Sequence, residues 1–434
     1  MDAQEFQKRR AQLMAQVGKG NIAIIASANT RTRNRDVDYP FRQDSDFYYL
    51  TGFNEPNALA AFIPGREQGQ YILFCQEFDE KKALWEGAHA GLEGATEKYG
   101  ADDSFPITDL GDILPGLLEN KHKVFYPMGR DPELDHQLME WITHIRSQTR
   151  SGINAPGELV SLEHTLHEMR LIKSPAEIKL MQKAADVSAK AHIRAMLNCK
   201  AGRYEYQVEG DIIHEFIDNG LRAVAYPSIV AGGKNACVLH YVENKAVLND
   251  GDLLLIDAGA ECDHYAADIT RTFPVNGVFS AAQKALYQLV LDAQLAALAE
   301  IKPGAPWNKA HDASVEVLTQ GLVELGLLVG EVDKLIEDES YKVFYMHRIG
   351  HWLGMDVHDV GDYKIDDQWR LLEPGMVLTI EPGLYIPHNC LAVDAKWRGI
   401  GIRIEDDVLV TKQGYEILTQ AIPKTIADIE AMMQ

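Results

Sequence analysis

Two short segments of the sequence each place a carboxylate directly after an apolar, strand-like run. The acid is Asp257 in GDLLLIDAG and Glu381 in GMVLTIEPG, each two residues before a glycine. Each segment precedes a second β-patterned segment with a further acid, Asp268 in ADITRTFPV and Glu405 in IRIEDDVLV. Chance similarity is the alternative, but the matched spacing indicates a duplicated unit whose paired strands bring four carboxylates to one place.

Carboxylates that end apolar strands resist burial unless they are paired or bind metal. Considered alone, Asp257 could simply cap the turn at Gly259. Four ionised carboxylates, however, cannot share a pocket without cations, because like charges force some of them to stay protonated. Two divalent cations balance four negative charges. The sequence therefore predicts a dinuclear hydrolytic site, with its metals about 3.5–4 Å apart.

Histidines cluster in the same half of the chain. The segment FYMHRIGHWLGMDVHD holds His347, His351 and His358 within twelve residues, and His240 precedes the first acidic segment. A single histidine is usually a surface or packing residue, whereas three this close indicate a functional site. HRIGH has the spacing of the zinc-protease motif HExxH, but Arg348 replaces the essential glutamate, which excludes that class.

The elements that must position these residues fall into two halves. Residues 4–17 are predicted to form an amphipathic helix, and residues 21–27 and 71–78 read as buried strands. Strands interleaved with helical segments predict an α/β layer in the first half. The polar, glycine-containing stretch 147–160 is a candidate linker.

A second domain is expected to begin with a long helix. Ser174 followed by Pro175 is a typical helix start, since serine caps the first turn and proline fits the first helical position. We therefore place the domains at residues 1–172 and 173–434.

Composition narrows the class of protein. The 434 residues include 42 Lys and Arg against 64 Asp and Glu, a net charge of −22. This charge disfavours nucleic acid and anionic membranes as partners. No apolar run is long enough for a transmembrane helix, and the first residues lack the apolar core of a secretory signal. Five scattered cysteines without a CxxC pair indicate reduced thiols, so we expect a cytoplasmic protein.

Together these motifs resemble the pita-bread metallopeptidases from about residue 173 onward, and the whole chain is similar to the bacterial aminopeptidase P (Xaa-Pro aminopeptidase) family. The resemblance rests on MRLIKSPAEI, IDAGAECDHYAADITRTFPV, HRIGHWLGMDVHD, LEPGMVLTIEPGLY, GIRIEDDVLVT and, in the first half, YPFRQDSDFYYLTGFNEP. It implies an α/β (α+β) architecture. A creatinase-like N-terminal α/β domain would precede a pita-bread domain with a pseudo-twofold internal repeat.

The resemblance also implies five metal ligands. Asp268 and Glu405 match residues that bridge both ions, Asp257 matches a ligand of one ion, and His351 and Glu381 match ligands of the other. A donor set of four carboxylates and one imidazole suits Mn²⁺. Mn²⁺ is the expected ion, with Co²⁺, Zn²⁺ or Fe²⁺ able to substitute.

The resemblance to this family also implies roles for the residues around the ions. A hydroxide bridging the metals is the expected nucleophile, and Glu381 would relay its proton. His240 and His358 would hydrogen-bond the substrate or its developing oxyanion. His347 would line the pocket that receives proline.

Four further residues complete the expected site. Arg403 lies two residues from Glu405, so on one strand both would share a face and Arg403 could orient that carboxylate; a surface salt bridge is the alternative. Tyr385 is a candidate wall for the proline ring, or a plain core residue. Asp36 and Trp85, from the N-terminal domain, match positions that shape the site, in some members from a neighbouring subunit; ordinary packing is the alternative for Trp85.

The expected activity is release of the first amino acid from peptides with proline in second position. A peptide bond before proline has no N–H. A metal site that binds the substrate through the carbonyl oxygen alone can therefore act on this bond. A prolidase, confined to Xaa-Pro dipeptides, is the alternative, and a non-catalytic peptide-binding module is a distant one. Methionine aminopeptidases generally lack so long an N-terminal domain. We expect a homo-oligomer, a tetramer first and a dimer second.

Overall fold

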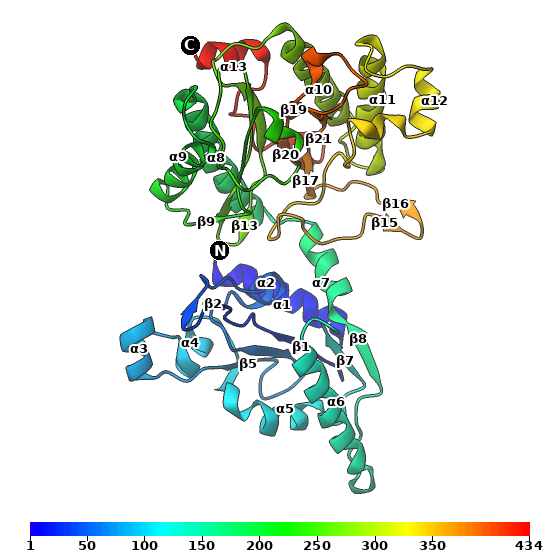
Figure 1. Ribbon diagram of the computed structural model, residues 1–434. Coiled ribbons are helices and arrows are strands. Elements are labelled where there is room, and N and C mark those ends of the chain that lie inside the picture. The colour runs from blue at the N-terminus through cyan, green and yellow to red at the C-terminus, as the bar shows by residue number, and fades with distance from the viewer. The chain divides into compact units, whose positions relative to one another are not determined.

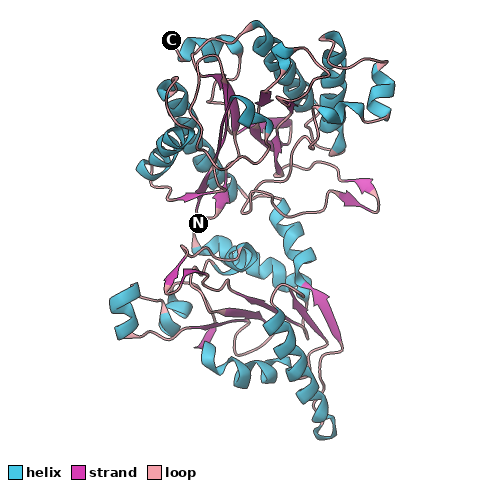
Figure 2. Cartoon of the chain, viewed as in Figure 1, coloured by secondary structure: helices cyan, strands magenta, loops and turns pink.

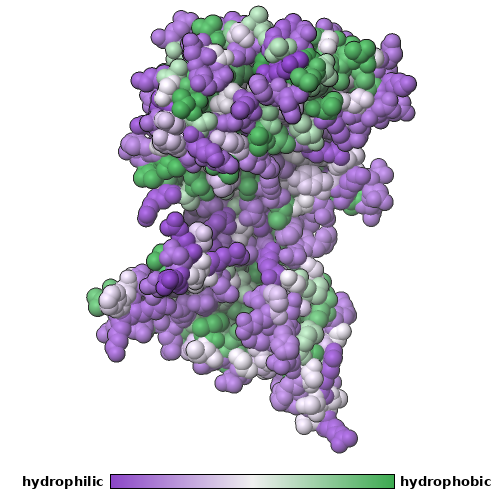
Figure 3. Space-filling model, in the orientation of Figure 1, coloured by the Kyte–Doolittle hydropathy of each residue, from purple (hydrophilic) through white to green (hydrophobic).

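A computed structural model describes residues 1–434, and the chain folds into two compact units, Met1–Met169 and Arg170–Gln434. In Figure 1 the first unit runs from blue to teal and the second from green to red. No helix combines the length and the apolar character that crossing a membrane would require. Hydrophilic side chains predominate on the face drawn in Figure 3, with smaller apolar patches between them.

The first unit is built on one six-stranded sheet, in the order β6-β5-β4-β1-β7-β8. Its strands are β1 (Ile22–Ala26), β4 (Leu59–Phe62), β5 (Tyr71–Cys75), β6 (Asp103–Pro106), β7 (Lys123–Tyr126) and β8 (Glu158–Ser161). Only β4 runs antiparallel to its neighbours, and a small exposed hairpin joins β2 (Thr32–Asn34) to β3 (Val37–Asp38). The mixed α/β layer predicted from the sequence is confirmed.

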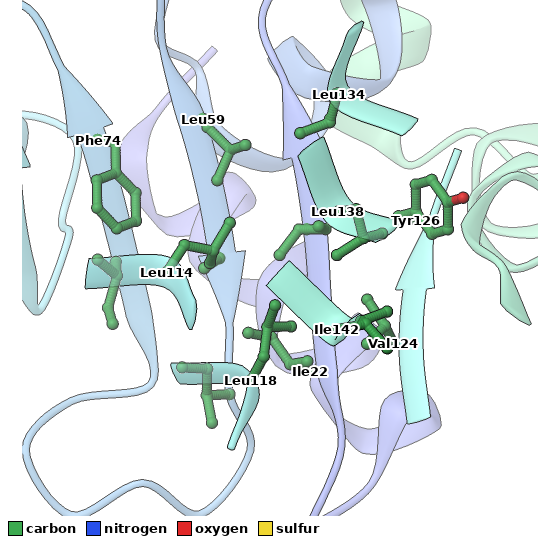
Figure 4. Close-up of a cluster of buried hydrophobic side chains, with 14 of the residues drawn as sticks. Ile22, Leu59, Phe74, Leu114, Leu118, Val124, Tyr126, Leu134, Leu138 and Ile142 are labelled. Atoms are coloured by element: carbon green, nitrogen blue, oxygen red, sulfur yellow. The ribbon is translucent and has the colours of Figure 1, made fainter. Parts of the chain in front are cut away.

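Seven helices accompany this sheet. They are α1 (Ala3–Val17), α2 (Ser45–Thr51), α3 (Glu80–Glu86), α4 (Gly91–Glu97), α5 (Leu110–Leu118), α6 (Pro132–Ser147) and α7 (Leu162–Leu171), whose end carries the division between the units. Leu114 and Leu118 of α5 and Leu138 of α6 cover one face of the strands (Figure 4). There they bury Ile22 and Phe74, which explains the nearly continuous apolar runs of β1 and β5.

The stretch 147–160 is not the linker that its composition predicts. The helix α6 reaches Ser147, and β8 begins at Glu158 and pairs with β7. Because β8 is an exposed edge strand, its residues are more polar than those of the inner strands, and the stretch therefore resembles a loop.

Helices lie on two sides of the strands in the second unit. The helices are α8 (Pro175–Asn198), α9 (Glu205–Asp218), α10 (Ala281–Ala299), α11 (Asn308–Glu324), α12 (Val332–Glu337) and α13 (Ile426–Met432). The pair α8 and α9 packs on one side, and α10 with α11 on the other (Figure 2). The predicted start of α8 is confirmed, because the Ser174 hydroxyl accepts from Glu177 N and Glu177 caps Ser174 N in return.

The strands of the second unit form several small sheets. They are β9 (Ala223–Val224), β10 (Ile229–Gly232), β11 (Leu253–Asp257), β12 (Ala260–Cys262), β13 (Tyr265–Ala266), β14 (Thr270–Pro274), β15 (Lys364–Ile365), β16 (Gln368–Trp369), β17 (Val377–Ile380), β18 (Gly383–Ile386), β19 (Ile400–Arg403), β20 (Asp406–Thr411) and β21 (Gly414–Ile417). The orders β10-β11-β14 and β17-β20-β21 are the two sheets that carry the acids.

The duplicated unit is visible in how these sheets present their carboxylates. Asp257 ends β11, and Glu381 follows β17 directly. Asp268 precedes β14, the antiparallel partner of β11, and Glu405 precedes β20, the antiparallel partner of β17. Each copy therefore delivers one acid after a strand and one acid before the next.

Candidate metal centre

One cavity of about 260 Å³ in the second unit gathers the residues that the sequence singles out. Its lining consists of Leu239, His240, Asp257, Asp268, His347, Arg348, Gly350, His351, His358, Glu381, Arg403 and Glu405. All five predicted metal ligands are among them, with His240, His347, His358 and Arg403. A larger cavity of about 670 Å³ in the first unit contains none of these residues.

Two glycines allow the backbone to approach closely around the acids. A Cβ on Gly259 would lie 1.7 Å from the carbonyl oxygen of Ala267, beside Asp268. A Cβ on Gly350 would lie 1.9 Å from the carbonyl oxygen of Thr379. Glycine is therefore required at both places for the acid-bearing segments to meet.

His351 reaches the carboxylates from an irregular segment that runs along the edge of β17. The amide of Thr379 donates to the carbonyl of His351, and the amide of Leu353 donates to Val377. The imidazole lies with Nε2 3.3 Å from Asp268 Oδ2 and 3.6 Å from Glu381 Oε1. The potential ligand atoms of Asp268, His351 and Glu405 all lie within 4.8 Å of one another.

Asp257 joins the cluster through a tyrosine. The Tyr226 hydroxyl lies 2.7 Å from Asp257 Oδ1 and 2.5 Å from Asp268 Oδ1, so its single hydrogen serves both carboxylates. Arg403 approaches the other Asp257 oxygen, with Nη2 2.5 Å from Oδ2. Each oxygen of Asp257 thus has a partner that fixes the orientation of the carboxylate.

Burial and mutual repulsion shift the pKa values of the acids. Burial raises the pKa of Asp257 and raises that of Glu381 to about 7, and burial with three neighbouring carboxylates raises that of Glu405 well above its ordinary value. Burial also disfavours the charge of Asp268, but the hydrogen bond and charge of His351, the Tyr226 hydroxyl and the charge of Arg403 together outweigh burial and lower the pKa of Asp268. Burial would lower the pKa of His351, yet Asp268 and Glu381 raise it to about 9.

These shifts show that the carboxylates need positive charge from elsewhere. Without metal, protons supply this positive charge, bound to His351 and to the carboxyl groups whose pKa values are raised. Divalent cations would supply the same charge, and four carboxylates with one imidazole form an oxygen-rich donor set. The side chains present therefore fit a metal centre.

Arg403 connects the carboxylates to the wall of the pocket. It is 4% exposed, and its Nε and Nη1 donate to Thr270 Oγ1 and to the Tyr385 hydroxyl, each over 3.0 Å. Thr270 donates in turn to Glu405 Oε2 over 2.6 Å. We predicted from the sequence that Arg403 and Glu405 share one face of a single strand. This prediction is wrong, because β19 ends at Arg403 and β20 begins after Glu405.

The remaining histidines lie around the acids. His347 Nε2 is 2.9 Å from the Tyr385 hydroxyl, and burial lowers the pKa of His347 to about 4, so the ring is neutral at pH 7. His358 packs edge-on against His351, with ring centroids 4.3 Å apart. His240 is exposed and lines the cavity from an irregular segment after β10. Tyr385 is buried, and its ring packs against that of His347 with the centroids 5.5 Å apart.

Several polar residues that hold the ligands were not singled out from the sequence. Tyr226 and Thr270 are two of them. Thr379 donates to Glu381 over 3.3 Å, and Asp407 accepts from the amide of Asp268 over 3.2 Å. Thr270 could have been found from the sequence, because it lies two residues after Asp268 and residues at that spacing in a strand share a face. Tyr226 has no local signal.

Two expected substrate residues lie in the first unit. Trp85 is 86% exposed on α3, a helix with no buried residue. Asp36 is exposed in the turn between β2 and β3. Neither lines the cavity in the second unit.

Comparison with known proteins defines the class to which this chain belongs. Residues 179–412 match metallopeptidase family M24, and residues 6–126 match the aminopeptidase P N-terminal domain. The chain belongs to metallopeptidase family M24. This confirms the expected pita-bread fold and the expected N-terminal domain.

Individual relatives cover almost the whole chain. The Xaa-Pro aminopeptidase of Haemophilus influenzae is 46% identical over 99% of this chain and 97% of its own length. The solved structure of Pseudomonas aeruginosa aminopeptidase PepP is 57% identical, covers 100% of this chain and 98% of its own, and superposes with a TM-score of 0.98. Zinc-substituted aminopeptidase P of Escherichia coli, solved with product, is 43% identical over 100% of this chain and 98% of its own, with a TM-score of 0.97. The resemblance to bacterial aminopeptidase P is thereby confirmed.

Proposed function

We propose that this chain is a metal-dependent aminopeptidase that releases the first residue from peptides with proline in second position. The observation that carries the proposal is the cavity of the second unit, where five potential metal ligands and three further histidines converge. Full-length similarity to Xaa-Pro aminopeptidases supports the same activity.

Each side chain of the site has a definite task in this proposal. When bound, two divalent cations supply an activated water and polarise the scissile carbonyl. Glu381 carries the proton from the attacking water to the departing proline nitrogen. His240 and His358 donate hydrogen bonds to the carbonyl oxygen as it gains negative charge.

The proline ring is expected to lie against His347 and Tyr385. The hydrogen bond between these two side chains fixes the wall, and the neutral His347 ring presents an uncharged face to the proline. Because proline lacks an N–H, binding through the carbonyl and this wall replaces the backbone contacts that other peptidases use.

Four finer features belong to the same proposal. Mn²⁺ is the preferred ion because carboxylates outnumber imidazole four to one, with Co²⁺, Zn²⁺ or Fe²⁺ as substitutes. Exposed Leu84 and Trp85 on α3 favour a homo-oligomer, a tetramer before a dimer, in which Trp85 and Asp36 shape a site. The five free cysteines favour a reducing, cytoplasmic location. We retain 1–172 and 173–434 as the functional domains, the first for site shaping and oligomer contacts.

The test compares an Xaa-Pro-Yaa tripeptide with the matching Xaa-Pro dipeptide. The protein is stripped with a chelator, reloaded with Mn²⁺, and assayed for free Xaa. The proposal expects faster release from the tripeptide and none from the stripped protein. Release from the dipeptide alone would make the enzyme a prolidase, and release that survives chelation would overturn the metal chemistry.

A further inference from the structure

One buried carboxylate outside the metal centre organises the segment that carries His240. Glu205 begins α9 and is fully buried. Burial of a carboxylate is tolerated when its oxygens are fully hydrogen-bonded. The donors to Glu205 therefore show what the buried side chain holds in place.

All four hydrogen bonds to the Glu205 side chain come from one stretch of chain, residues 232–246. The donors are Gly232 N (2.8 Å) and Asn235 Nδ2 (2.9 Å) to Oε1, and Tyr241 OH (2.8 Å) and Ala246 N (2.8 Å) to Oε2. They lie at the start of the stretch, in its 3₁₀ turn, directly beside His240, and at its end. A single side chain thus ties the whole stretch to α9.

Besides these hydrogen bonds, the stretch is held by the packing of Cys237, Leu239 and Tyr241 against a buried apolar cluster. After the 3₁₀ turn Gly233–Cys237, residues 238–246 form neither helix nor strand. Asn244 supplies a second anchor, since it accepts from Val230 N and donates to the Ser228 carbonyl. Where the backbone lacks a regular ladder, such side-chain bonds determine its conformation.

His240 depends on this backbone more than His347 and His351 do. His347 and His351 each have a ring nitrogen close to another side chain of the site, whereas the exposed His240 ring has no hydrogen bond in the structure. Its position at the cavity, next to Leu239, is therefore set by the backbone on either side.

We propose that Glu205 is a positioning residue for the peptidase reaction, acting through residues 238–246 to hold His240 at the cavity. The inference rests on the proposed function. Glu205 accepts no hydrogen bond from a predicted metal ligand. Its loss is therefore expected to change turnover and to leave metal binding intact.

The first variant is Glu205→Gln, which keeps the size of the side chain but replaces one acceptor oxygen with a donor. Two of the four hydrogen bonds are lost, and kcat/KM on the tripeptide is expected to fall by about 10- to 100-fold, as for a displaced catalytic group. Mn²⁺ binding, measured by calorimetry, should match that of the unmodified protein. Wild-type kcat/KM in this variant would overturn the inference.

Glu177→Gln is the matched control. Glu177 is 2% exposed, opens α8, and accepts from Ser174 N and the Tyr265 hydroxyl, neither of which lines the cavity. This variant should lose thermal stability as Glu205→Gln does, yet keep its kcat/KM. An equal loss of activity in both variants would indicate a general effect of destabilisation and would overturn the inference.

A double-mutant comparison separates positioning from a purely structural role. In a His240→Ala background, Glu205→Gln should lower kcat/KM by less than about twofold, because its target is gone. A further tenfold loss would contradict action through His240. Tyr241→Phe removes only the hydrogen bond beside His240 and carries the same test if Glu205→Gln fails to fold. Absence of Xaa-Pro cleavage by the unmodified, Mn²⁺-loaded protein would instead overturn the proposed function itself.

Discussion

Arg403 is the side chain whose replacement tests the architecture of the metal centre most directly. Its guanidinium is buried and donates to three partners, Asp257, Tyr385 and Thr270, and through Thr270 it reaches Glu405. It therefore supplies both a positive charge and a fixed geometry. Two substitutions separate these contributions.

Arg403→Lys keeps the charge but can reach only one of the three partners. Two lost hydrogen bonds at roughly 0.5–1.5 kcal/mol each amount to about 1–3 kcal/mol, which lowers kcat/KM by about 5- to 150-fold. Arg403→Met removes the charge as well. Breaking a buried ion pair costs about 3–5 kcal/mol, so kcat/KM should fall by more than about 100-fold.

The assay measures kcat/KM on a tripeptide at saturating Mn²⁺, together with thermal stability before and after metal removal. Arg403→Met should destabilise the metal-free protein most, because cations can replace part of the missing charge. Arg398→Lys is the control, since Arg398 bonds only the Val393 carbonyl and lies outside the cavity. Equal activities of the lysine and methionine variants would refute a role for the charge, and full activity of both would refute the whole interpretation.

Two further predictions concern the support of the ligands and the pH dependence of stability. Tyr226→Phe removes the hydroxyl shared by Asp257 and Asp268, and Mn²⁺ affinity measured by calorimetry should fall by about 10- to 100-fold; an unchanged affinity would exclude an orienting role. Burial, aided by the charges of nearby basic side chains, lowers the pKa of His311 from 6.5 to about 4, so the unfolded chain takes up a proton that the folded chain does not. Stability should therefore decrease by up to about 3 kcal/mol as the pH falls from about 6.5 to 4. The free energy of unfolding, measured with urea, should lack this part of the decrease in His311→Gln. The control variant of the exposed His136, His136→Gln, should retain it. Identical pH profiles of the two variants would contradict the assignment.

The acids of the site could be predicted because the information is local. Asp257 and Glu381 each follow a short apolar strand, and Asp268 and Glu405 each precede another, so periodicity alone indicates where the carboxylates lie. Four carboxylates in one place then need positive charge, from bound cations or from protons, whatever the details of the fold. Identifying His351 as a ligand needed the family resemblance, since its neighbours His347 and His358 have the same residue type.

Side chains that meet the acids from distant parts of the chain escaped prediction. Tyr226 lies 31 positions from Asp257 and 42 from Asp268, and nothing in its own segment indicates that it faces them. Arg403 was expected near Glu405 for an incorrect reason. β19 pairs with β18 and β20 pairs with β17, so the chain changes sheets between these two residues.

The single imidazole of the metal centre follows from what flanks the two equivalent strands. On one side, β11 pairs with β14 and β17 with β20, and this shared arrangement delivers the four carboxylates. On the other side the copies differ. Strand β10 flanks β11, whereas the irregular segment with His351 flanks β17.

Each flanking segment places a different side chain over the acids. Tyr226, just before β10, covers Asp257 and Asp268 with a hydroxyl, and His351 covers Asp268 and Glu381 with a ring nitrogen. Burial and three neighbouring carboxylates raise the pKa of the Tyr226 phenol well above its ordinary value, so it keeps its proton and acts as a donor. A neutral imidazole, in contrast, can bind a metal ion. The repeat thus accounts for the carboxylates, and its two unlike flanks account for a candidate metal site with only one imidazole among its predicted ligands.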